Sequence, residues 1–367
     1  MSTRRMSSAS LETVTLLIVA GLLLLLPLYG SDFFVEFVMT RTMMLGIAAS
    51  SVVFLAAYGG MISMAQLLMF GVAGFMIGNF VAETGSKGLK LGWNPWVAIL
   101  IALAITSFVA LIMGALASRT TGIYYLMLTF TYAVIGVLFF RSVVELSGSS
   151  GLTGIDPPAL FDDHPVRQYY LGLGLSIVIY LAFRLIRSTP FGMVLQGIRD
   201  DPVRMASLGF NVPLHRTLAF TLAGFVAGIA GVLNVWWNGQ IAPQSIDAGP
   251  TIDLLVIAVI GGISRLEGAW LGAFVFVAAN NYLRDLPLAS SFNEVLQHIP
   301  GEWTLTESTF HTWIGVLVLV IVVASPEGLM GIIDRCYKAI LSVFARTPRR
   351  PTTPKDAGAL DPEHTGS

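Results

Sequence analysis

The sequence predicts an all-α integral membrane protein, a polytopic bundle of about ten transmembrane helices (8–10). Hydrophobic residues make up 55% of the 367 residues and charged residues only 12%, whereas roughly 25% of a typical soluble domain is charged. The mean hydropathy of +0.76 is far above that of an ordinary water-soluble fold. Helices are the expected spanning elements because they satisfy their own backbone hydrogen bonds in lipid.

The apolar runs follow one another along most of the chain, bounded by charged residues and by Pro or Gly. In order they cover residues 14–30, 42–58, 64–82, 96–117, 122–140, 169–186, 217–237, 251–263, 266–283 and 313–325. The eighth and tenth runs are short, so each is expected to extend or to be broken. The first run follows Arg4 and Arg5, but no small-x-small cleavage site comes after it, so we interpret it as an uncleaved helix.

The distribution of positive charge predicts the orientation of the bundle. With the N-terminus inside, the inner segments carry 15 of the 21 Lys and Arg residues and the outer segments carry 6, which favours an N-in, C-in arrangement. The predicted regions are a cytoplasmic N-terminus (1–13), a transmembrane domain (14–333) with outer loops at 141–168 and 284–312, and a cytoplasmic tail (334–367). The tail is polar and Pro-rich, which predicts partial disorder.

Several classes of function are disfavoured by composition and motifs. A net charge of −1 argues against nucleic-acid binding. The single cysteine, Cys336, excludes an intramolecular disulfide, and no Cys/His cluster has metal-site spacing. The spans hold almost no ionisable residues, Asp253 lying near the end of one run, and the chain has neither a phosphate-binding Gly-Lys-Ser/Thr loop nor a catalytic constellation. We therefore expect no metal, no cofactor and no enzymatic activity in this chain.

The segment 187–216 is a long cytoplasmic loop with its own helix signals. Helix connections usually have roughly 2–8 residues, and this one has about 30. Asp201 suits the N-cap, Pro202 the first helical position and Gly209 the left-handed position after the last turn, which predicts a helix over 202–208. A second short helix is expected over 190–199. The segment is either a docking element for a soluble partner or a pair of amphipathic helices lying on lipid.

Two glycine pairs interrupt the apolar runs at similar places in the two halves of the chain. They are Gly59-Gly60 and Gly261-Gly262, and each leads into another Gly- and Ala-rich run. Glycine-interrupted segments in both halves predict a transporter's substrate path, with Ser63 and Gln66 as polar partners beyond the first pair. The alternative is two tight turns between closely packed helices. The further polar candidates for the path, each equally explained as a satisfied group between helices, are Asn79, Thr129, Asn234 and Ser264.

The order of these motifs resembles one family, the inner-membrane permease subunits of ABC importers for branched-chain amino acids, of the LivM type. The resemblance covers about 42–331 and is carried by residues 58–66, 122–130, 148–155, 188–211, 224–231, 261–272 and 326–331. Two features depart from the family pattern: Ser63-Met64-Ala65-Gln66 stands where Ser-Leu-Gly-Gln is usual, and the outer segment 284–312 is long. Urea and short-chain amide importers use closely similar permeases, so the substrate stays open.

The resemblance implies a bacterial plasma-membrane protein with several partners. These are ATP-binding ABC subunits, a homologous second permease subunit, an extracytoplasmic substrate-binding protein and the lipid bilayer. It also implies that residues 188–211 of this loop contact the ATPase, with the coupling residues Arg199, Asp200, Asp201, Pro202, Arg204 and Gly209. An ATP-independent channel or facilitator is the alternative of a different class, and it would not need the long capped loop. A membrane enzyme is a distant third.

Overall fold

The computed structural model describes the helical bundle and little of either terminus. The described residues are 21–27, 29, 31, 33–82, 88–89, 91–147, 150–155, 157–158, 165–282, 315, 325, 328–332 and 335. Outside them lie the predicted segment 1–13, the first part of the run 14–30, the outer loop 284–312, most of the run 313–325 and the tail except Arg335.

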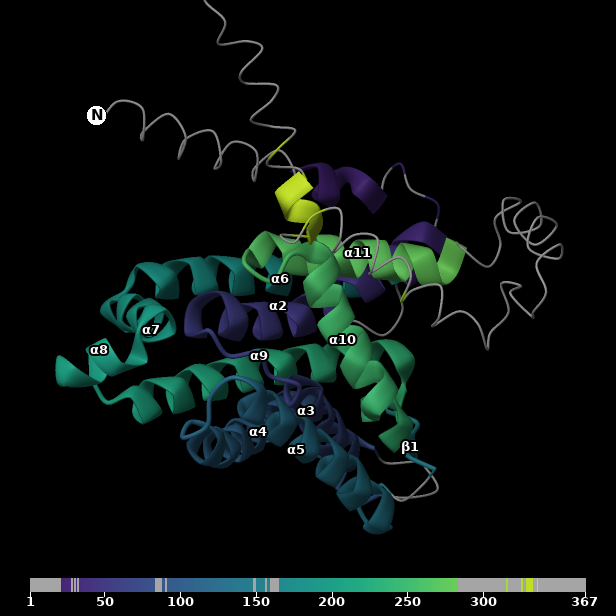
Figure 1. The fold of residues 1–367 in the computed structure, drawn as a ribbon. Coiled ribbons are helices and arrows are strands. Elements are labelled where there is room, and N and C mark those ends of the chain that lie inside the picture. Colours follow the sequence, from purple (N-terminus) through teal and green to yellow (C-terminus); the bar gives the residue numbers. More distant parts are fainter. Residues whose placement is uncertain are drawn as a thin grey trace, which may run out of the picture.

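Helices form nearly all of the described chain (Figure 1). In order the elements are the π-helix η1 (Phe34–Thr40), α2 (Arg41–Gly59), α3 (Gln66–Val81), α4 (Pro95–Ala117), α5 (Ile123–Ser142), β1 (Leu152–Thr153), α6 (Pro165–Ser188), α7 (Pro190–Asp200), α8 (Pro202–Ser207), α9 (Val212–Asn238), β2 (Gln240–Ile241), the 3-10 helix η2 (Pro243–Ile246), α10 (Ala248–Gly261) and α11 (Leu266–Tyr282). The second to ninth predicted runs each coincide with one of these helices. The all-α prediction needs one small addition, because β1 and β2 form a two-residue antiparallel pair.

Five described stretches are long and apolar enough to cross a bilayer unaided. They are Phe34–Gly59, Pro95–Ala117, Ile123–Ser142, Val166–Ser188 and Val212–Asn238. α3 has 16 residues, so at ~1.5 Å per residue it falls short of the roughly 30 Å hydrocarbon core. α10 and α11 qualify only as a pair, with a bend of 117° between them. The described residues form a membrane bundle, and the total of ten spans and the orientation remain predictions.

α2 lies at the centre of the bundle. It contacts α6, α9, α10 and α11, and Figure 1 shows it between α6 and α9. In the apolar window of Phe34–Gly59, 83% of residues are buried, against 28% for α4. Leu100, Phe108 and Leu116 of α4 are among the large apolar side chains left exposed. A helix buried on all sides transmits movement to every neighbour, whereas α4 presents a face suited to lipid.

Small residues allow the central helices to pack closely, as is common between membrane helices. A Cβ atom on Gly231 of α9 would overlap the main-chain oxygen of Phe70 of α3. Gly228, about one turn earlier, faces α4, where a Cβ atom would lie 3.1 Å from the side-chain methyl group of Thr106. Gly231 therefore allows α9 to pack directly against the main chain of α3, where any side chain would separate the two helices, and Gly228 allows a close contact with α4.

The second predicted glycine pair forms a sharp corner between α10 and α11. Gly262 has φ +112°, a conformation that L side chains rarely adopt, and it ends α10. A Cβ atom on Gly261 would overlap the main-chain oxygen of Gly268, and one on Gly272 would overlap that of Ile257. The two helices can meet this closely only because these positions lack side chains.

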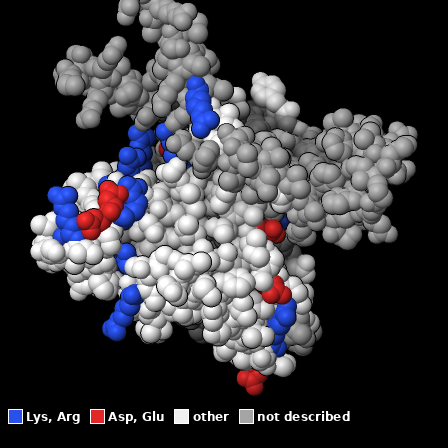
Figure 2. Space-filling view, in the orientation of Figure 1, with Lys and Arg blue, Asp and Glu red and all other residues white. Residues whose placement is uncertain are grey.

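The two ends of the bundle differ in charge (Figure 2). Blue Lys and Arg atoms gather at the end formed by α7 and α8, called the α7–α8 end below. At the opposite end, called the β1 end, Arg141 of α5 pairs with Asp247 at 2.6 Å, and Asp247 also caps α10 by accepting from the Ala248 amide at 2.8 Å. This is the distribution that the predicted orientation requires if the α7–α8 end is cytoplasmic.

Candidate functional site

The predicted cytoplasmic loop folds into two short capped helices joined to longer ones. α6 continues to Ser188 and α9 begins at Val212, so the connecting residues are 189–211, here called the coupling segment. Thr189 caps α7 by accepting from the Gly192 amide at 3.3 Å, and Pro190 occupies the first turn. Leu195 and Ile198 of α7 are fully buried. α7 is therefore part of the packed bundle rather than a helix lying loosely on lipid.

α8 is the exposed part of the coupling segment, and its cap follows the sequence prediction. Oδ1 of Asp201 accepts from the amides of Val203 and Arg204, both at 3.0 Å. Gly209 adopts φ +90° with open space around the missing Cβ atom. Val203 is 74% exposed and Leu208 65%. An exposed pair of apolar side chains on a firmly capped helix can bind a protein surface.

α7 is attached to the C-terminal end of α2, the same place as the first predicted glycine pair. Gly60 ends α2 with φ +63°, and a Cβ atom there would overlap Cγ of Arg199. The guanidinium of Arg199 donates from Nη1 to the main-chain oxygen of Ala57 at 2.5 Å and pairs with Asp200 at 2.9 Å. The absence of a side chain at Gly60 thus allows the coupling segment to pack against the end of α2.

The same segment is also attached to the start of α9. Asn211 caps α9 by accepting from the Leu214 amide at 3.1 Å. The ring of His215 stacks on Phe191 of α7 at 5.8 Å and meets Phe210 edge-on at 6.2 Å. The coupling segment therefore contacts one end of each of two central helices, α2 and α9.

Most of the polar residues predicted for a substrate path are buried among helices. The Ser63 hydroxyl accepts from the Ala65 amide at 3.2 Å, and the Thr129 hydroxyl accepts from the Met64 amide at 3.2 Å. Asn79 donates from Nδ2 to the main-chain oxygens of Phe75 and Leu146, both at 2.8 Å. These bonds connect parts of the protein and leave the amide nitrogen engaged. Ser264 is exposed in the α10–α11 corner.

Gln66 differs from these neighbours. It is fully buried at the first turn of α3, and neither its amide oxygen nor its nitrogen has a hydrogen-bond partner among the described residues. A buried amide without partners is costly, so this position fits a polar molecule better than it fits a sealed core. The role of Gln66 and of the glycine pairs in a path remains a prediction.

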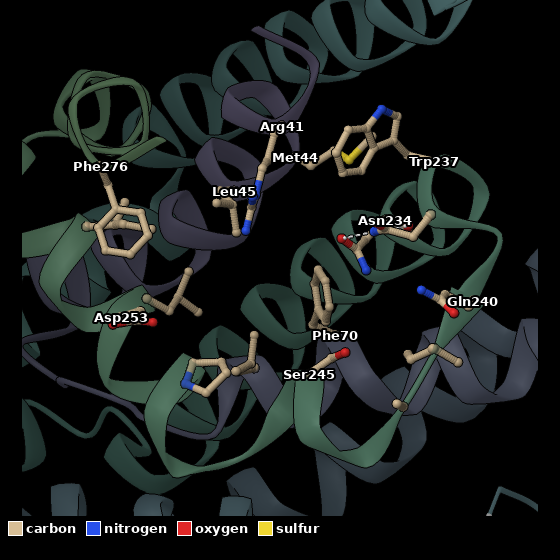
Figure 3. A pocket seen from close by; sticks show the side chains of 17 residues that line it. Arg41, Met44, Leu45, Phe70, Asn234, Trp237, Gln240, Ser245, Asp253 and Phe276 are labelled. Carbon is tan, nitrogen blue, oxygen red and sulfur yellow. Dashed lines mark hydrogen bonds between the residues drawn. The ribbon is translucent and has the colours of Figure 1, made fainter. Parts of the chain in front are cut away.

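A cavity of about 490 Å³ opens between the N-terminal half of α2 and the C-terminal end of α9 (Figure 3). It is called the α2–α9 cavity below. Its lining residues are Arg41, Met44, Leu45, Leu67, Phe70, Asn234, Trp237, Asn238, Gln240, Ile241, Ala242, Ser245, Pro250, Asp253, Leu254, Ile257 and Phe276. Because β2 and the start of α2 belong to it, the cavity lies toward the β1 end. Of the residues predicted for the path, only Asn234 lines it.

The α2–α9 cavity combines an apolar wall with a few polar groups. Met44, Leu67, Phe70 and Leu254 are buried lining residues, and the polar lining residue Asn234 is half-buried. Asn238 donates from Nδ2 to the side-chain oxygen of Asn234 at 2.9 Å, which fixes the orientation of that amide. A cavity of this size and composition is typical of a small-molecule site.

Arg41 and Asp253 are the charged residues of this lining, and sequence reasoning did not select either. Figure 3 shows Arg41 extending from α2 into the cavity and Asp253 on α10 to one side of it. Both are half-buried. The signal was present in the sequence, since an ionisable residue at the edge of an apolar run is by default a candidate for function. What the sequence lacked was the proximity of two residues that lie far apart along the chain.

Comparison with known families and proteins gives a consistent result. The family model described as the permease component of branched-chain amino acid transport systems matches residues 34–324. This range contains the α2–α9 cavity and the coupling segment. No solved structure gives a significant match to the chain.

Individual relatives are more distant. The chain is 23% identical over 253 residues to the high-affinity branched-chain amino acid transport system permease protein LivM of Salmonella typhimurium, with 61% of this chain and 59% of that protein covered. It is 26% identical over 300 residues to the probable LivM of Methanocaldococcus jannaschii, covering 78% and 84%. It is also 22% identical over 245 residues to the ribose import permease protein RbsC of Escherichia coli K12, covering 61% and 73%.

Proposed function

Since the chain belongs to the family of permease components of branched-chain amino acid transport systems, we propose that it is the transmembrane permease subunit of an ATP-driven importer. It moves branched-chain or other hydrophobic amino acids across the bacterial inner membrane. ATP is hydrolysed by a separate ATPase subunit, and the other partners are a second, homologous permease subunit and an extracytoplasmic binding protein. The observation that carries the proposal is the family match over 34–324, supported by an apolar cavity inside the matched region.

The coupling segment is the proposed contact for the ATPase subunit. Val203 of α8 and Leu208, the residue directly after it, offer an exposed apolar surface, and Arg204 and Asp200 add charge beside it. Figure 1 shows α8 at the tip of the α7–α8 end. A rigid, capped helix pair at this position can follow the closure of an ATPase dimer.

Two helices connect this contact with the α2–α9 cavity. α2 contacts α7 at Ala57 and lines the cavity at Arg41, Met44 and Leu45. α9 begins beside the coupling segment and lines the cavity at its far end, and its 27 residues extend about 40 Å. A displacement of the coupling segment therefore moves two cavity walls without passing through flexible loops. This is the proposed route from ATP binding to the opening of the path.

The exit from the cavity is proposed to pass Gln66. Leu67 and Phe70 of α3 line the cavity, and Gln66 begins the same helix on the side of the α7–α8 end. Its unpartnered amide offers hydrogen bonds to a passing solute, and Ser63 lies beside it. Gly59, Gly60, Gly261 and Gly262, at the ends of α2 and α10, are proposed to flank this path.

The test is uptake into vesicles that hold the complete complex of permease subunits and ATPase, with binding protein outside. We expect uptake of L-leucine that depends on ATP and on the binding protein. Uptake without ATP would favour a channel or facilitator. ATP-dependent uptake of ribose or urea in place of leucine would keep the importer and replace its substrate, which the similarity to a ribose permease makes a specific alternative.

A further inference from the structure

Arg41 and Asp253 give the α2–α9 cavity two opposite charges inside an otherwise uncharged lining. Their charges are close enough to influence one another. The two residues belong to different helices, Arg41 to α2 and Asp253 to α10, and both side chains are half-buried. Placing two charges in a low-dielectric site is expensive. A cavity that served only neutral solutes would have no need of either.

The arrangement of the two charges restricts the class of solute. A cavity with one cation and one anion favours a solute that is neutral overall but carries separated charges. Sugars and urea carry no charges. Their hydrogen bonds to Arg41 and Asp253 would have to compete with the attraction between these two opposite charges. An α-amino acid at neutral pH carries a carboxylate and an ammonium group on one carbon atom.

We propose that Arg41 binds the carboxylate and Asp253 the ammonium group of an α-amino acid in the α2–α9 cavity. The inference rests on the proposed function and adds the residues that determine its substrate class. A guanidinium suits a carboxylate because its fork of donors can bind both oxygens. A carboxylate suits an ammonium group because its oxygens accept charge-assisted hydrogen bonds.

The remaining lining accommodates the amino-acid side chain. Met44, Leu67, Phe70 and Leu254 form an apolar surface beside the charged pair. The Asn234 amide, fixed by Asn238 at 2.9 Å, stands across Phe70 from Asp253 in Figure 3. The permease thus selects the zwitterion, and the apolar wall favours an apolar side chain, independently of any binding protein.

The experiment measures protection of a cavity cysteine in the complete complex without binding protein. Ser245 lines the cavity and is exposed, so Ser245→Cys in a Cys336→Ser background gives one position to label with a small aqueous thiol reagent. The added solutes are L-leucine, leucinol, which lacks the carboxylate, 4-methylpentanoate, which lacks the ammonium group, and ribose. We expect leucine to protect at concentrations about tenfold or more below the other three, a difference of about 1.4 kcal/mol or more.

Charge-specific variants separate recognition from a structural effect. Arg41→Gln is expected to abolish the advantage of leucine over leucinol, and Asp253→Asn its advantage over 4-methylpentanoate. Arg41→Lys keeps a cation and is expected to keep the leucine preference, and it also covers the case in which Arg41→Gln fails to insert. Arg141→Gln is the matched control, because Arg141 belongs to the exposed pair with Asp247 outside the cavity, and it should leave the ranking unchanged.

Two results overturn the inference. One is equal protection by leucine, leucinol and ribose, or no protection by any of them. The other is an unchanged ranking in both Arg41→Gln and Asp253→Asn. In either case ATP-dependent leucine uptake by the unsubstituted complex still reports on the proposed function, so the two failures are distinguishable.

Discussion

Arg199 of α7 donates a hydrogen bond from Nη1 to the main-chain oxygen of Ala57, in the last turn of α2, at 2.5 Å. The last carbonyl groups of a helix lack intrahelical partners and carry partial negative charge. A guanidinium therefore stabilises the C-terminal end of α2 and at the same time attaches the coupling segment to it. One contact joins the proposed ATPase docking site to the helix that begins with Arg41 of the cavity.

Replacing Arg199 should uncouple ATP hydrolysis from transport. Arg199→Gln removes a charged hydrogen bond, a loss of about 1–2 kcal/mol at this partly exposed position. We expect leucine uptake to fall severalfold while ATP hydrolysis and co-purification of the ATPase subunit remain. Arg204→Gln on the exposed helix α8 is the contrasting variant, because it should weaken co-purification instead. If both variants lower co-purification equally, Arg199 acts in docking and not in coupling.

Gly209 offers a purely conformational test of the docking helix. Open space surrounds the missing Cβ atom, so Gly209→Val introduces no overlap and its effect comes from φ +90° alone, about 1–2 kcal/mol. We expect reduced binding of the ATPase subunit and reduced ATP-dependent uptake, with unchanged membrane insertion. Gly174→Val is the matched control, because Gly174 of α6 also has open space and has no positive φ. Normal ATPase binding and normal uptake in the Gly209→Val variant would show that the coupling segment is not the contact for the ATPase subunit.

The packing at the α10–α11 corner predicts a variant that fails at the level of folding. A Cβ atom on Gly261 overlaps the main chain of Gly268, which cannot move as a flexible side chain can. Gly261→Ala should cost about 1–3 kcal/mol and lower the amount of folded complex, measured by size-exclusion chromatography in detergent. Gly249→Ala is the control, since its Cβ atom would meet nothing within 4 Å. Equal yields of the two variants would mean that α10 and α11 separate more easily than the structure implies.

Opposite sides of the membrane are predicted for the C-terminus and for the segment around residue 160. The prediction rests on the excess of Lys and Arg in the inner segments. Reporter domains fused at these two places should give signals typical of the cytoplasm and of the outside, respectively. Signals from the same side would require an even number of spans between the two points, where the predicted runs give five, and therefore a different assignment of the runs.

Hydropathy and local helix signals were sufficient for most element positions, and the reason is physical. A spanning helix must be apolar along its own length, and caps such as Asp201 act within three residues, so both are written locally. The 117° bend between α10 and α11 could not be read in this way, since glycine pairs permit either an unwound helix or a tight corner. The presence of Arg41 and Asp253 in one cavity lining was equally hidden, because it depends on how α2 packs against α10.

The exit path past Gln66 provides the most direct test of the predicted site residues. Single cysteines at Gly60, Ser63, Gln66 and Gly262 in a Cys336→Ser background should differ in reactivity toward small aqueous thiol reagents. Gln66 and Ser63 are buried in the structure, so we expect little labelling at rest and increased labelling when binding protein, leucine and ATP are added. Gly60 is exposed but packed against Arg199 of the coupling segment. Labelling of a cysteine at position 60 should therefore change when the coupling segment moves.

Thr106 supplies the control for burial. Its hydroxyl bonds to the Ala102 oxygen at 2.8 Å within α4, and the residue is fully buried outside the proposed path. Thr106→Cys should therefore stay unlabelled in every state. If the cysteines at positions 63 and 66 behave like this control during turnover, while substitution there only lowers expression, the unpartnered Gln66 amide belongs to tight helix packing and the solute leaves the cavity by another route.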